Sequence, residues 1–378
     1  MATTHVFIVG TNTFKYHLQY LFSGTGAKEN FIDFNNSAVS ILNHATENSL
    51  TGLIADFSRI RIGDFVIFYL QQDFSSSIFE GKFYGVFRVQ NTFFMDNNDD
   101  NQFLKNELKK SLTFRVNIEP YQIYPVGVSE WEALDEIKNI NSPTQMLWSL
   151  IYRKLKGNRG NTMITLYESE RLINLIRTKN RQNQLENFNS LTFDLATQTI
   201  VNDGNNYEYT GRKESVNLLP RIISKHDRQR QFETHLQAFI LSNIENIQAF
   251  SNENIEWIGN EVSCGVGMQR IDIMISSVNN DIRKIIPIEL KSTFAQLGIT
   301  SQLQRYIDWL EQYYLPNKPS DIEPMIISKK IINKESEMFQ NLINSFIEFN
   351  ERNPNHLNIR YIEFEISENS INFHEIDY

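Results

Sequence analysis

The chain has 378 residues, of which 41% are apolar and 21% charged, with a formal net charge of −9 at pH 7. This composition excludes a wholly disordered chain, a collagen and a coiled coil, and no apolar run reaches the roughly 18–20 residues of a membrane span. The first residues lack the basic segment and apolar stretch of a secretory signal, so we expect a cytoplasmic protein of two or three domains.

The first half of the chain contains short segments rich in β-branched and aromatic residues. Bounded by Gly, Asp or Ser, they predict strands at residues 4–10, 62–70, 83–89 and 114–118. Apolar residues at helical spacing predict helices at residues 38–48, 146–154 and 169–177. Strands with few helices between them favour a small, barrel-like α+β domain that ends near residue 178.

Two of these strands resemble the PUA-like fold, in particular its EVE and YTH relatives. Residues 62–69, IGDFVIFY, match the G-D-x-V-x-F-Y strand of those domains, and residues 81–89, GKFYGVFRV, match their F-x-G-V-F-x-V strand. Three later segments follow in the expected order, at residues 120–124, 157–164 and 168–176. The resemblance implies an N-terminal PUA-like barrel domain, residues 1–178, that binds nucleic acid.

The resemblance also implies a pocket for a modified base. EVE and YTH domains hold such a base in an aromatic cage, where it gains stacking on aromatic faces and hydrogen bonds along its polar edge. The candidates for this pocket are Asn12 as a polar reader and Tyr20, Phe22, Trp131 and Trp148 as stacking residues. Trp148 lies at helical spacing among leucines, and a Trp in such a position is a core residue more often than a cage residue.

Two clusters of basic residues are candidates for contacts with DNA phosphates. The first consists of Arg153, Lys154, Lys156 and Arg159. The second consists of Arg221, Lys225, Arg228 and Arg230. An acidic protein can bind DNA if its basic residues are concentrated on one face. The alternative is that both clusters are ordinary solvated charge runs.

The middle of the chain predicts a linker with one hairpin, residues 179–227. Residues 178–190 are polar and rich in Asn and Gln, and residues 191–209 alternate around an expected turn at Asp203-Gly204.

The remaining chain, residues 228–378, predicts an α/β domain with a mixed sheet. We expect helices at residues 229–247, 300–314 and 336–348. We expect strands at residues 255–258, 270–276, 285–291, 324–328, 359–365 and 371–376.

Two of these strands carry charged residues that could act together. Asp272 interrupts an apolar strand and must be paired or bound to a cation, because a bare buried carboxylate is costly. Glu289 and Lys291 share one face of the next strand, since side chains alternate. The two carboxylates on neighbouring strands could bind Mg²⁺, with Mn²⁺ as an alternative, and Lys291 could orient the attacking water. Glu233, at the edge of the preceding helix, could join them.

This order of residues resembles the PD-(D/E)xK nuclease signature, D…ExK, with Glu233 as the helix carboxylate. Residues 302–306, QLQRY, are similar to a helix of the archaeal mismatch-endonuclease branch, where the glutamine, here Gln302, lies near the metal. This chain lacks a proline before Asp272, and Pro287 inside the next strand suggests an edge or a bulge. A bare D…ExK also arises by chance, so the alternative is an interstrand Glu–Lys pair beside a salt-bridged Asp.

Together these features predict a Mg²⁺-dependent endonuclease of restriction type that recognises a modified base in double-stranded DNA, in a prokaryotic cytoplasm. Arg228, Arg230 and Arg270 are further candidates for DNA contacts. Cutting both strands requires two active sites, so we expect a homodimer, without a membrane partner. The alternatives are a repair endonuclease for mismatched or branched DNA, a conventional sequence-specific restriction enzyme, and a non-catalytic nucleic-acid-binding protein.

Overall fold

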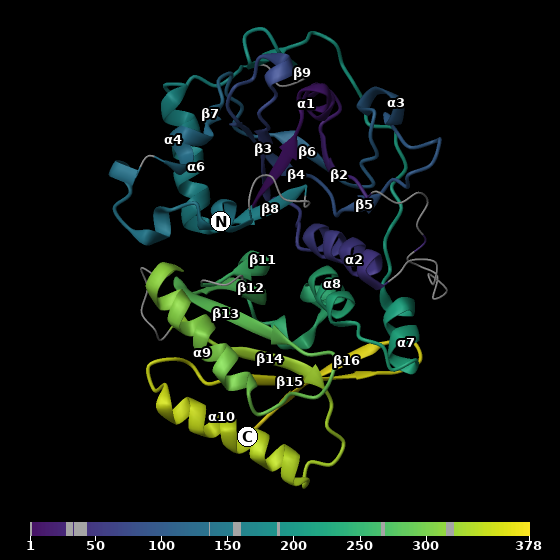
Figure 1. Ribbon diagram of the computed structural model, residues 1–378, viewed down its shortest axis with the longest axis vertical. Coiled ribbons are helices and arrows are strands. Elements are labelled where there is room, and N and C mark those ends of the chain that lie inside the picture. The colour runs from purple at the N-terminus through teal and green to yellow at the C-terminus, as the bar shows by residue number, and fades with distance from the viewer. Residues whose placement is uncertain are drawn as a thin grey trace. The chain divides into compact units, whose positions relative to one another are not determined.

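The computed structural model describes residues 2–27, 33, 44–135, 137–153, 160–186, 190–265, 269–314 and 321–378. The chain forms two compact units (Figure 1). The first unit comprises Met1–Asp33 and Asp56–Val216, and the second comprises Phe34–Ala55 and Asn217–Tyr378. The segment predicted as a linker, residues 179–227, is therefore divided between the two units.

The first unit is an α+β domain around an eight-stranded mixed sheet. The strands of the sheet are β1 (Thr4–Val9), β2 (Phe22–Thr25), β3 (Phe65–Leu70), β4 (Lys82–Val89), β5 (Phe94–Met95), β6 (Phe114–Pro120), β7 (Val128–Ser129) and β8 (Asn161–Ile164). Their order is β2-β6-β4-β3-β1-β8, with β5 on β6 and β7 on β4. The helices are α1 (Thr11–Gln19), α3 (Lys105–Leu108), α4 (Glu130–Leu134), α5 (Trp148–Arg153) and α6 (Leu166–Lys179). All four predicted strands are confirmed, whereas α1 was not predicted.

The sheet curves strongly, and two glycines show how. The register between β3 and β4 shifts between Val66 and Phe68, opposite Gly85, whose φ of +77° only glycine adopts readily. At the two ends of the strand order, Gly160 lies so close to Thr25 that a Cβ on the glycine would approach the threonine Oγ1 to 2.3 Å. The ends of the sheet thus approach each other at this corner, although no ladder between β2 and β8 is present among the described residues.

The hairpin predicted in the linker is present, but its turn lies elsewhere. Strands β9 (Leu191–Asp194) and β10 (Thr199–Asn202) pair in antiparallel fashion, so residues 195–198 make the turn and Asp203-Gly204 follows the hairpin. The Asp194 side chain accepts hydrogen bonds from the Ala196 amide and the Thr197 hydroxyl inside the turn. These hydrogen bonds stabilise the turn at residues 195–198. The Asp203-Gly204 dipeptide therefore predicted the turn at the wrong place.

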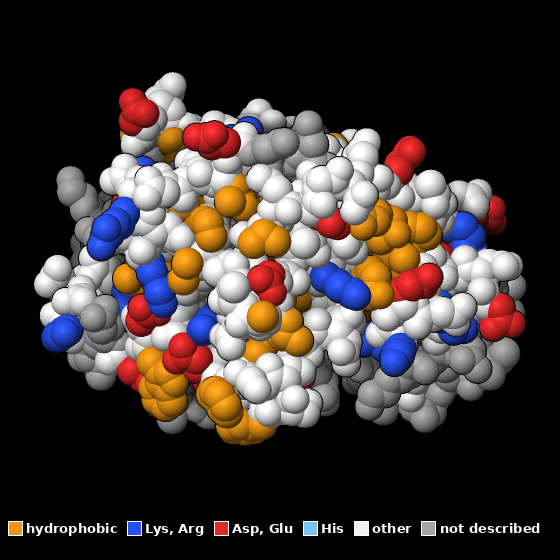
Figure 2. Space-filling model, turned by 90° about the horizontal axis from the view of Figure 1, so that it is seen from above, with side chains coloured by type: hydrophobic (Ala, Val, Ile, Leu, Met, Phe, Trp, Pro, Cys, Tyr) orange, Lys and Arg blue, Asp and Glu red, His pale blue; other side chains and the backbone are white. Residues whose placement is uncertain are grey.

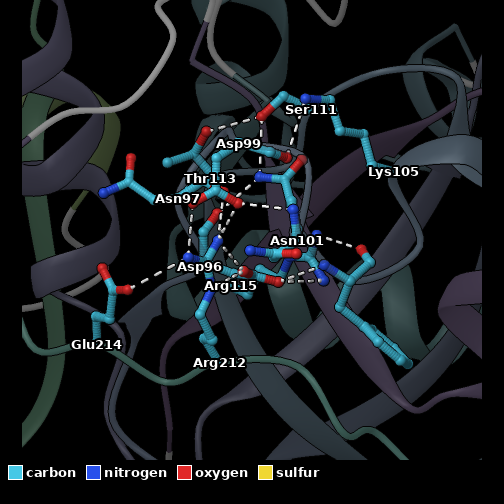
Figure 3. Close-up of polar contacts among 12 residues, drawn as sticks. Asp96, Asn97, Asp99, Asn101, Lys105, Ser111, Thr113, Arg115, Arg212 and Glu214 are labelled. Carbon is cyan, nitrogen blue, oxygen red and sulfur yellow. Dashed lines mark hydrogen bonds and ion pairs between the residues drawn. The ribbon is translucent and has the colours of Figure 1, made fainter.

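The irregular chain after the hairpin is fixed to the first unit by an ionic network (Figure 3). Arg212 pairs with Asp96 at 3.2 Å and with Asp99 at 2.7 Å. The fully buried Arg115 lies 3.3 Å from the other Asp96 oxygen, and Glu214 exchanges two backbone hydrogen bonds with Met95. These contacts explain why residues up to 216 group with the first unit although most of them lie outside helices and strands.

The second unit is an α/β domain with a mixed six-stranded sheet, as predicted. Its strands, in sheet order, are β11 (Ile255–Ser263), β12 (Arg270–Asn279), β13 (Ile282–Leu290), β14 (Met325–Lys329), β15 (Arg360–Ile366) and β16 (Ile371–Ile376). Strands β13, β14 and β15 are parallel, and the remaining neighbours are antiparallel. The helices are α7 (Leu219–Asp227), α8 (Glu233–Asn243), α9 (Ile299–Trp309) and α10 (Glu337–Arg352).

Pro287 lies in the middle of the sheet rather than in an edge strand. The pairing of β12 with β13 runs through Met274 and Pro287 without a shift, so the predicted bulge is absent. The ladder between β13 and β14 begins only at Ile288, and at Pro287 the strand therefore has a laddered neighbour on one side only. A residue without an amide proton is tolerated at such a position.

Helix α2 (His44–Ser58) contributes a buried ionic cluster to the second unit. The carboxylate of Glu47 accepts hydrogen bonds from Arg221 Nε at 2.7 Å and from His235 Nε2 at 2.8 Å. Lys225 Nζ lies 3.3 Å from its other oxygen. All four side chains are buried. We call these residues, Glu47, Arg221, Lys225 and His235, the Glu47 cluster.

The Glu47 cluster corrects the prediction for the second basic segment. Arg221 and Lys225, one helical turn apart on α7, point inward and neutralise Glu47. They are therefore not available for contacts with DNA phosphates.

The predicted helix at residues 38–48 lies partly outside the described residues, and the described helix starts at His44.

Candidate active site in the second unit

The two candidate metal ligands lie at the same level of neighbouring strands. The register of β12 and β13 pairs Ile273 with Ile288, so Asp272 and Glu289 follow as the next facing positions. Asp272 Oδ2 accepts a hydrogen bond of 2.8 Å from the amide of Leu290. The apolar residues that alternate with both carboxylates belong to the core, which fixes the carboxylates on the same side of the sheet.

Each carboxylate oxygen of Glu289 accepts a hydrogen bond from a side chain. One carboxylate oxygen accepts a hydrogen bond from the ammonium group of Lys291. The other lies 2.6 Å from the hydroxyl of Tyr306, which also lies 2.9 Å from the carbonyl oxygen of Arg270. Gln302 donates to the same hydroxyl at 2.8 Å. Gln302 therefore reaches Glu289 through Tyr306.

Helix α8 contributes two further side chains. Glu233, in the first turn of α8, accepts a hydrogen bond of 3.2 Å from the amide of Ser292, directly after Lys291. One turn later, Gln237 donates to the carbonyl oxygen of Asp272 at 2.8 Å. Glu289 thus contacts Lys291 directly and Gln302 through Tyr306, whereas Asp272 and Glu233 each accept a hydrogen bond from a backbone amide next to this pair, at Leu290 and Ser292.

Burial and neighbouring charges shift the pKa values of Asp272, Glu233 and Lys291 in this site. Burial and the negative charge of Glu289 raise the pKa of Asp272 well above its usual range, although the Leu290 amide opposes the shift. Burial also raises the pKa of Glu233, against the attraction of Lys291. Burial lowers the pKa of Lys291, but the charges of Glu289, Glu233 and Asp272 outweigh it, so that the pKa of Lys291 is raised. Clustered groups of this kind are typical of functional sites.

The donor set fits a hard divalent cation that takes few protein ligands. Among the described residues, no group of three or more His, Cys, Asp and Glu side chains lies close enough to hold a metal ion between them. Mg²⁺ is usually bound by one or two carboxylates and several waters, so Asp272 and Glu289 are sufficient protein ligands for it. A cation held by both would also relieve the repulsion from Glu289 that, together with burial, raises the pKa of Asp272.

Three residues of the site were not singled out from the sequence: Tyr306, Gln237 and Glu261. Tyr306 stands in the QLQRY segment, where its i, i+4 spacing to Gln302 was a usable signal. Glu261 lies 2.9 Å from Arg270, and Gln237 donates to its other oxygen at 3.4 Å. No local sequence pattern marks Gln237 or Glu261, because their neighbours come from other strands and helices.

The remaining candidates for DNA contacts are either exposed or outside the described residues. Arg228 and Arg230, which follow α7, are exposed, so their contact with DNA phosphates stays a prediction. Arg270 is exposed beside the candidate active site and paired with Glu261. Lys154, Lys156 and Arg159 lie outside the described residues, as does the side chain of Arg153.

The base-pocket candidates do not form one cage. Phe22 is fully buried and packs against His17 and Tyr209, so it belongs to the core. Tyr20 packs against Phe103 and Tyr207. The indole nitrogen of Trp148 donates to the carbonyl oxygen of Pro143 at 2.9 Å.

Two of these candidates remain accessible to a ligand. Trp131 is 61% exposed in the first turn of α4, and Asn12 is exposed in the first turn of α1.

Within the described part of the chain, no helix combines the length and the apolar composition that a membrane span requires.

Comparison with known proteins gives only distant similarities. No family model matches the chain, and no curated protein matches it. Among solved structures, a hypothetical protein from Leishmania major aligns with 11% identity and a TM-score of 0.28, covering 47% of this chain and 97% of its own. The human THYN1 protein in complex with 5-methylcytosine containing DNA aligns with 10% identity and a TM-score of 0.26, covering 46% and 97%.

A third structure, the DUF55 domain of human thymocyte nuclear protein 1, aligns with 12% identity and a TM-score of 0.24, covering 46% of this chain and 97% of its own. At these identities and TM-scores, the similarities carry no conclusion about this chain.

Proposed function

We propose that the protein is a metal-dependent DNA endonuclease of restriction type whose first unit recognises a modified base. The observation that carries this proposal is the convergence of Asp272, Glu289, Lys291 and Glu233 at the ends of β12 and β13 and the start of α8. The order and placement of these residues match the D…ExK signature that the sequence resembles. Carboxylates beside a lysine suit phosphodiester hydrolysis, in which charge develops on the phosphate oxygens.

Each side chain has a distinct role in this proposal. Asp272 and Glu289 would hold Mg²⁺, which when bound supplies a Lewis acid beside the scissile phosphate. Lys291 places a positive charge next to Glu289, where it can orient the attacking water and stabilise the phosphate. Tyr306 and Gln302 are positioning residues, because they fix the orientation of Glu289 through hydrogen bonds.

The proposal for the first unit has separate support. Its α+β architecture with a strongly curved mixed sheet suits the PUA-like resemblance of residues 62–69 and 81–89. Asn12 and Trp131 are the accessible members of the predicted pocket set. A base turned out of the duplex could gain stacking and hydrogen bonds from such side chains. Because one active site cuts one strand, we further propose that a homodimer makes the double-strand cut.

A cleavage assay on matched duplexes tests both units. The substrates are unmodified DNA and DNA containing 5-methylcytosine, 5-hydroxymethylcytosine or N6-methyladenine, each with Mg²⁺, and one duplex with a mismatch. The variant is Lys291→Ala, and the matched control is Lys284→Ala. Lys284 lies on the same strand and is also paired with a carboxylate, Glu253 at 2.7 Å, away from Asp272 and Glu289.

The proposal predicts cleavage of one modified duplex by the wild type and the control, and loss of cleavage in Lys291→Ala. Cleavage of unmodified DNA alone would keep the nuclease and overturn the modified-base reader. Cleavage of the mismatched duplex alone would indicate a repair endonuclease. Binding without any cleavage would indicate a non-catalytic nucleic-acid-binding protein.

A further inference from the structure

Two exposed phenylalanines stand on the loop between β3 and β4 of the first unit. Phe74 and Phe79 are each 68% exposed, and their ring centroids lie 6.2 Å apart. Figure 2 shows that hydrophobic side chains on the face it presents gather in separate patches rather than spreading evenly. Large apolar rings exposed together are unfavourable in water and mark sites of interaction. We call this loop, residues 73–79, the aromatic tip.

The aromatic tip is held rigidly although it is exposed. Asp73 and Ile78 exchange two backbone hydrogen bonds of 2.9 Å, and Ile78 is fully buried. The Asp73 carboxylate accepts hydrogen bonds from the hydroxyls of Ser75 and Ser76 at 2.6 and 2.7 Å. The tip therefore loses little conformational freedom when its rings are buried against a partner.

The same carboxylate ties the tip to the first turn of α1, which carries the base-reader candidate Asn12. Thr11 Oγ1 donates to Asp73 at 2.7 Å, and Thr11 directly precedes the pocket candidate Asn12. One turn further along α1, Lys15 is exposed and adds a positive charge to this surface. The tip is thus linked to the helix turn that carries the accessible polar reader.

We infer that the aromatic tip is a wedge that enters the DNA stack when the modified base is turned out. An extruded base leaves a gap between its neighbours, and proteins fill such gaps with apolar side chains that stack on the flanking bases. The inference rests on the proposed function of the first unit.

The exposed area argues against the competing occupant, a second copy of the chain. A phenylalanine presents at most about 150–250 Å², so two rings at this exposure offer roughly 200–350 Å². A stable protein–protein interface needs about 800 Å² from each partner. The rings are sufficient for one or two base stacks and fall well short of a dimer interface by themselves.

The test compares the full-length protein with the double variant Phe74→Ala/Phe79→Ala on a modified duplex with 2-aminopurine next to the modified base. The matched control is Ile62→Ala, because Ile62 is 65% exposed and precedes β3, whereas the tip follows that strand. We expect the affinity of the double variant to fall about 5- to 150-fold, the range of a base–aromatic stack. The wild type should raise the 2-aminopurine fluorescence because it disrupts the stacking of this base, and the double variant should not. Ile62→Ala should retain both properties, and Phe74→Tyr/Phe79→Tyr should restore them.

Two results would overturn the wedge while leaving the proposed function intact. One is a double variant that binds and responds like the wild type. The other is a double variant that becomes monomeric in sedimentation while the monomer keeps the fluorescence response, which would assign the tip to a contact between copies. A wild type that binds no modified duplex would instead overturn the proposed reader, and the wedge with it.

Discussion

The Glu47 cluster makes a quantitative prediction about the second unit. The substitution Glu47→Gln keeps the shape of the side chain but removes the charge that neutralises Arg221 and Lys225, which remain buried. Removing one partner of a buried ionic group costs about 3–5 kcal/mol, because the remaining charges are uncompensated. Against a total stability of about 5–15 kcal/mol, this is a large fraction.

Urea unfolding followed by tryptophan fluorescence measures this loss. The second unit contains Trp257 and Trp309, so replacing Trp131 and Trp148 with Phe leaves a signal from the second unit alone. With a slope of about 2 kcal/mol per molar urea, the midpoint should fall by roughly 1.5–2.5 M.

The control is Glu348→Ala, which removes the exposed pair with Arg352 and should cost less than about 0.5 kcal/mol. A Glu47→Gln loss of stability no larger than that of the control would refute both the burial of the cluster and the assignment of the part of α2 up to Ala55 to the second unit.

Three further predictions concern other parts of the chain. Burial lowers the pKa of His17 to about 3, below the value of about 6.5 in the unfolded chain. The contribution of its neutral ring to the free energy of unfolding is therefore complete above pH 6.5 and is about 2 kcal/mol smaller at pH 5. In His17→Gln the free energy of unfolding, measured with urea, should fall less between pH 7 and pH 5 than in the wild type. An equal fall in both proteins would contradict the role given to His17. Arg212→Ala removes the ion pairs with Asp96 and Asp99 and should lower the free energy of unfolding by about 1–2 kcal/mol. It should also accelerate limited proteolysis after residue 202, and an unchanged digestion rate would count against the ionic network. Tyr306→Phe should lower cleavage about 10- to 100-fold without changing DNA affinity, and equal losses in both would show that the residue is merely structural.

The sequence predicted most elements of both sheets because their signals are local. Alternating or continuous apolar runs bounded by turn residues mark β1, β3, β4 and the strands of the second unit. Helix α1 was missed because its buried face consists of Thr13, Phe14, His17 and Leu18, which is a weak apolar pattern. The hairpin turn was misplaced because Asp203-Gly204 is a stronger turn dipeptide than the residues that form the turn.

Contacts between segments that are far apart in the chain could not be predicted from local sequence patterns. Glu47 looks like a surface residue in its own segment, and its partners stand more than 170 positions later. The spacing of Arg221 and Lys225 did contain information, since residues four apart share one face of α7, and that face is buried. The candidate active site was predicted better, because Asp272 and Glu289 lie on the neighbouring strands β12 and β13 and Lys291 directly follows β13, in the order that their signature requires.

The most direct test of the central claim is the nicking of plasmid DNA that carries the modified bases, with and without Mg²⁺. The wild type and Lys284→Ala should cut with Mg²⁺ and stop in EDTA, whereas Lys291→Ala and Asp272→Asn should bind the plasmid without cutting it. Equal cutting by the wild type and Lys291→Ala, or cutting that persists in EDTA, would contradict the assignment of these residues as a metal-dependent nuclease site.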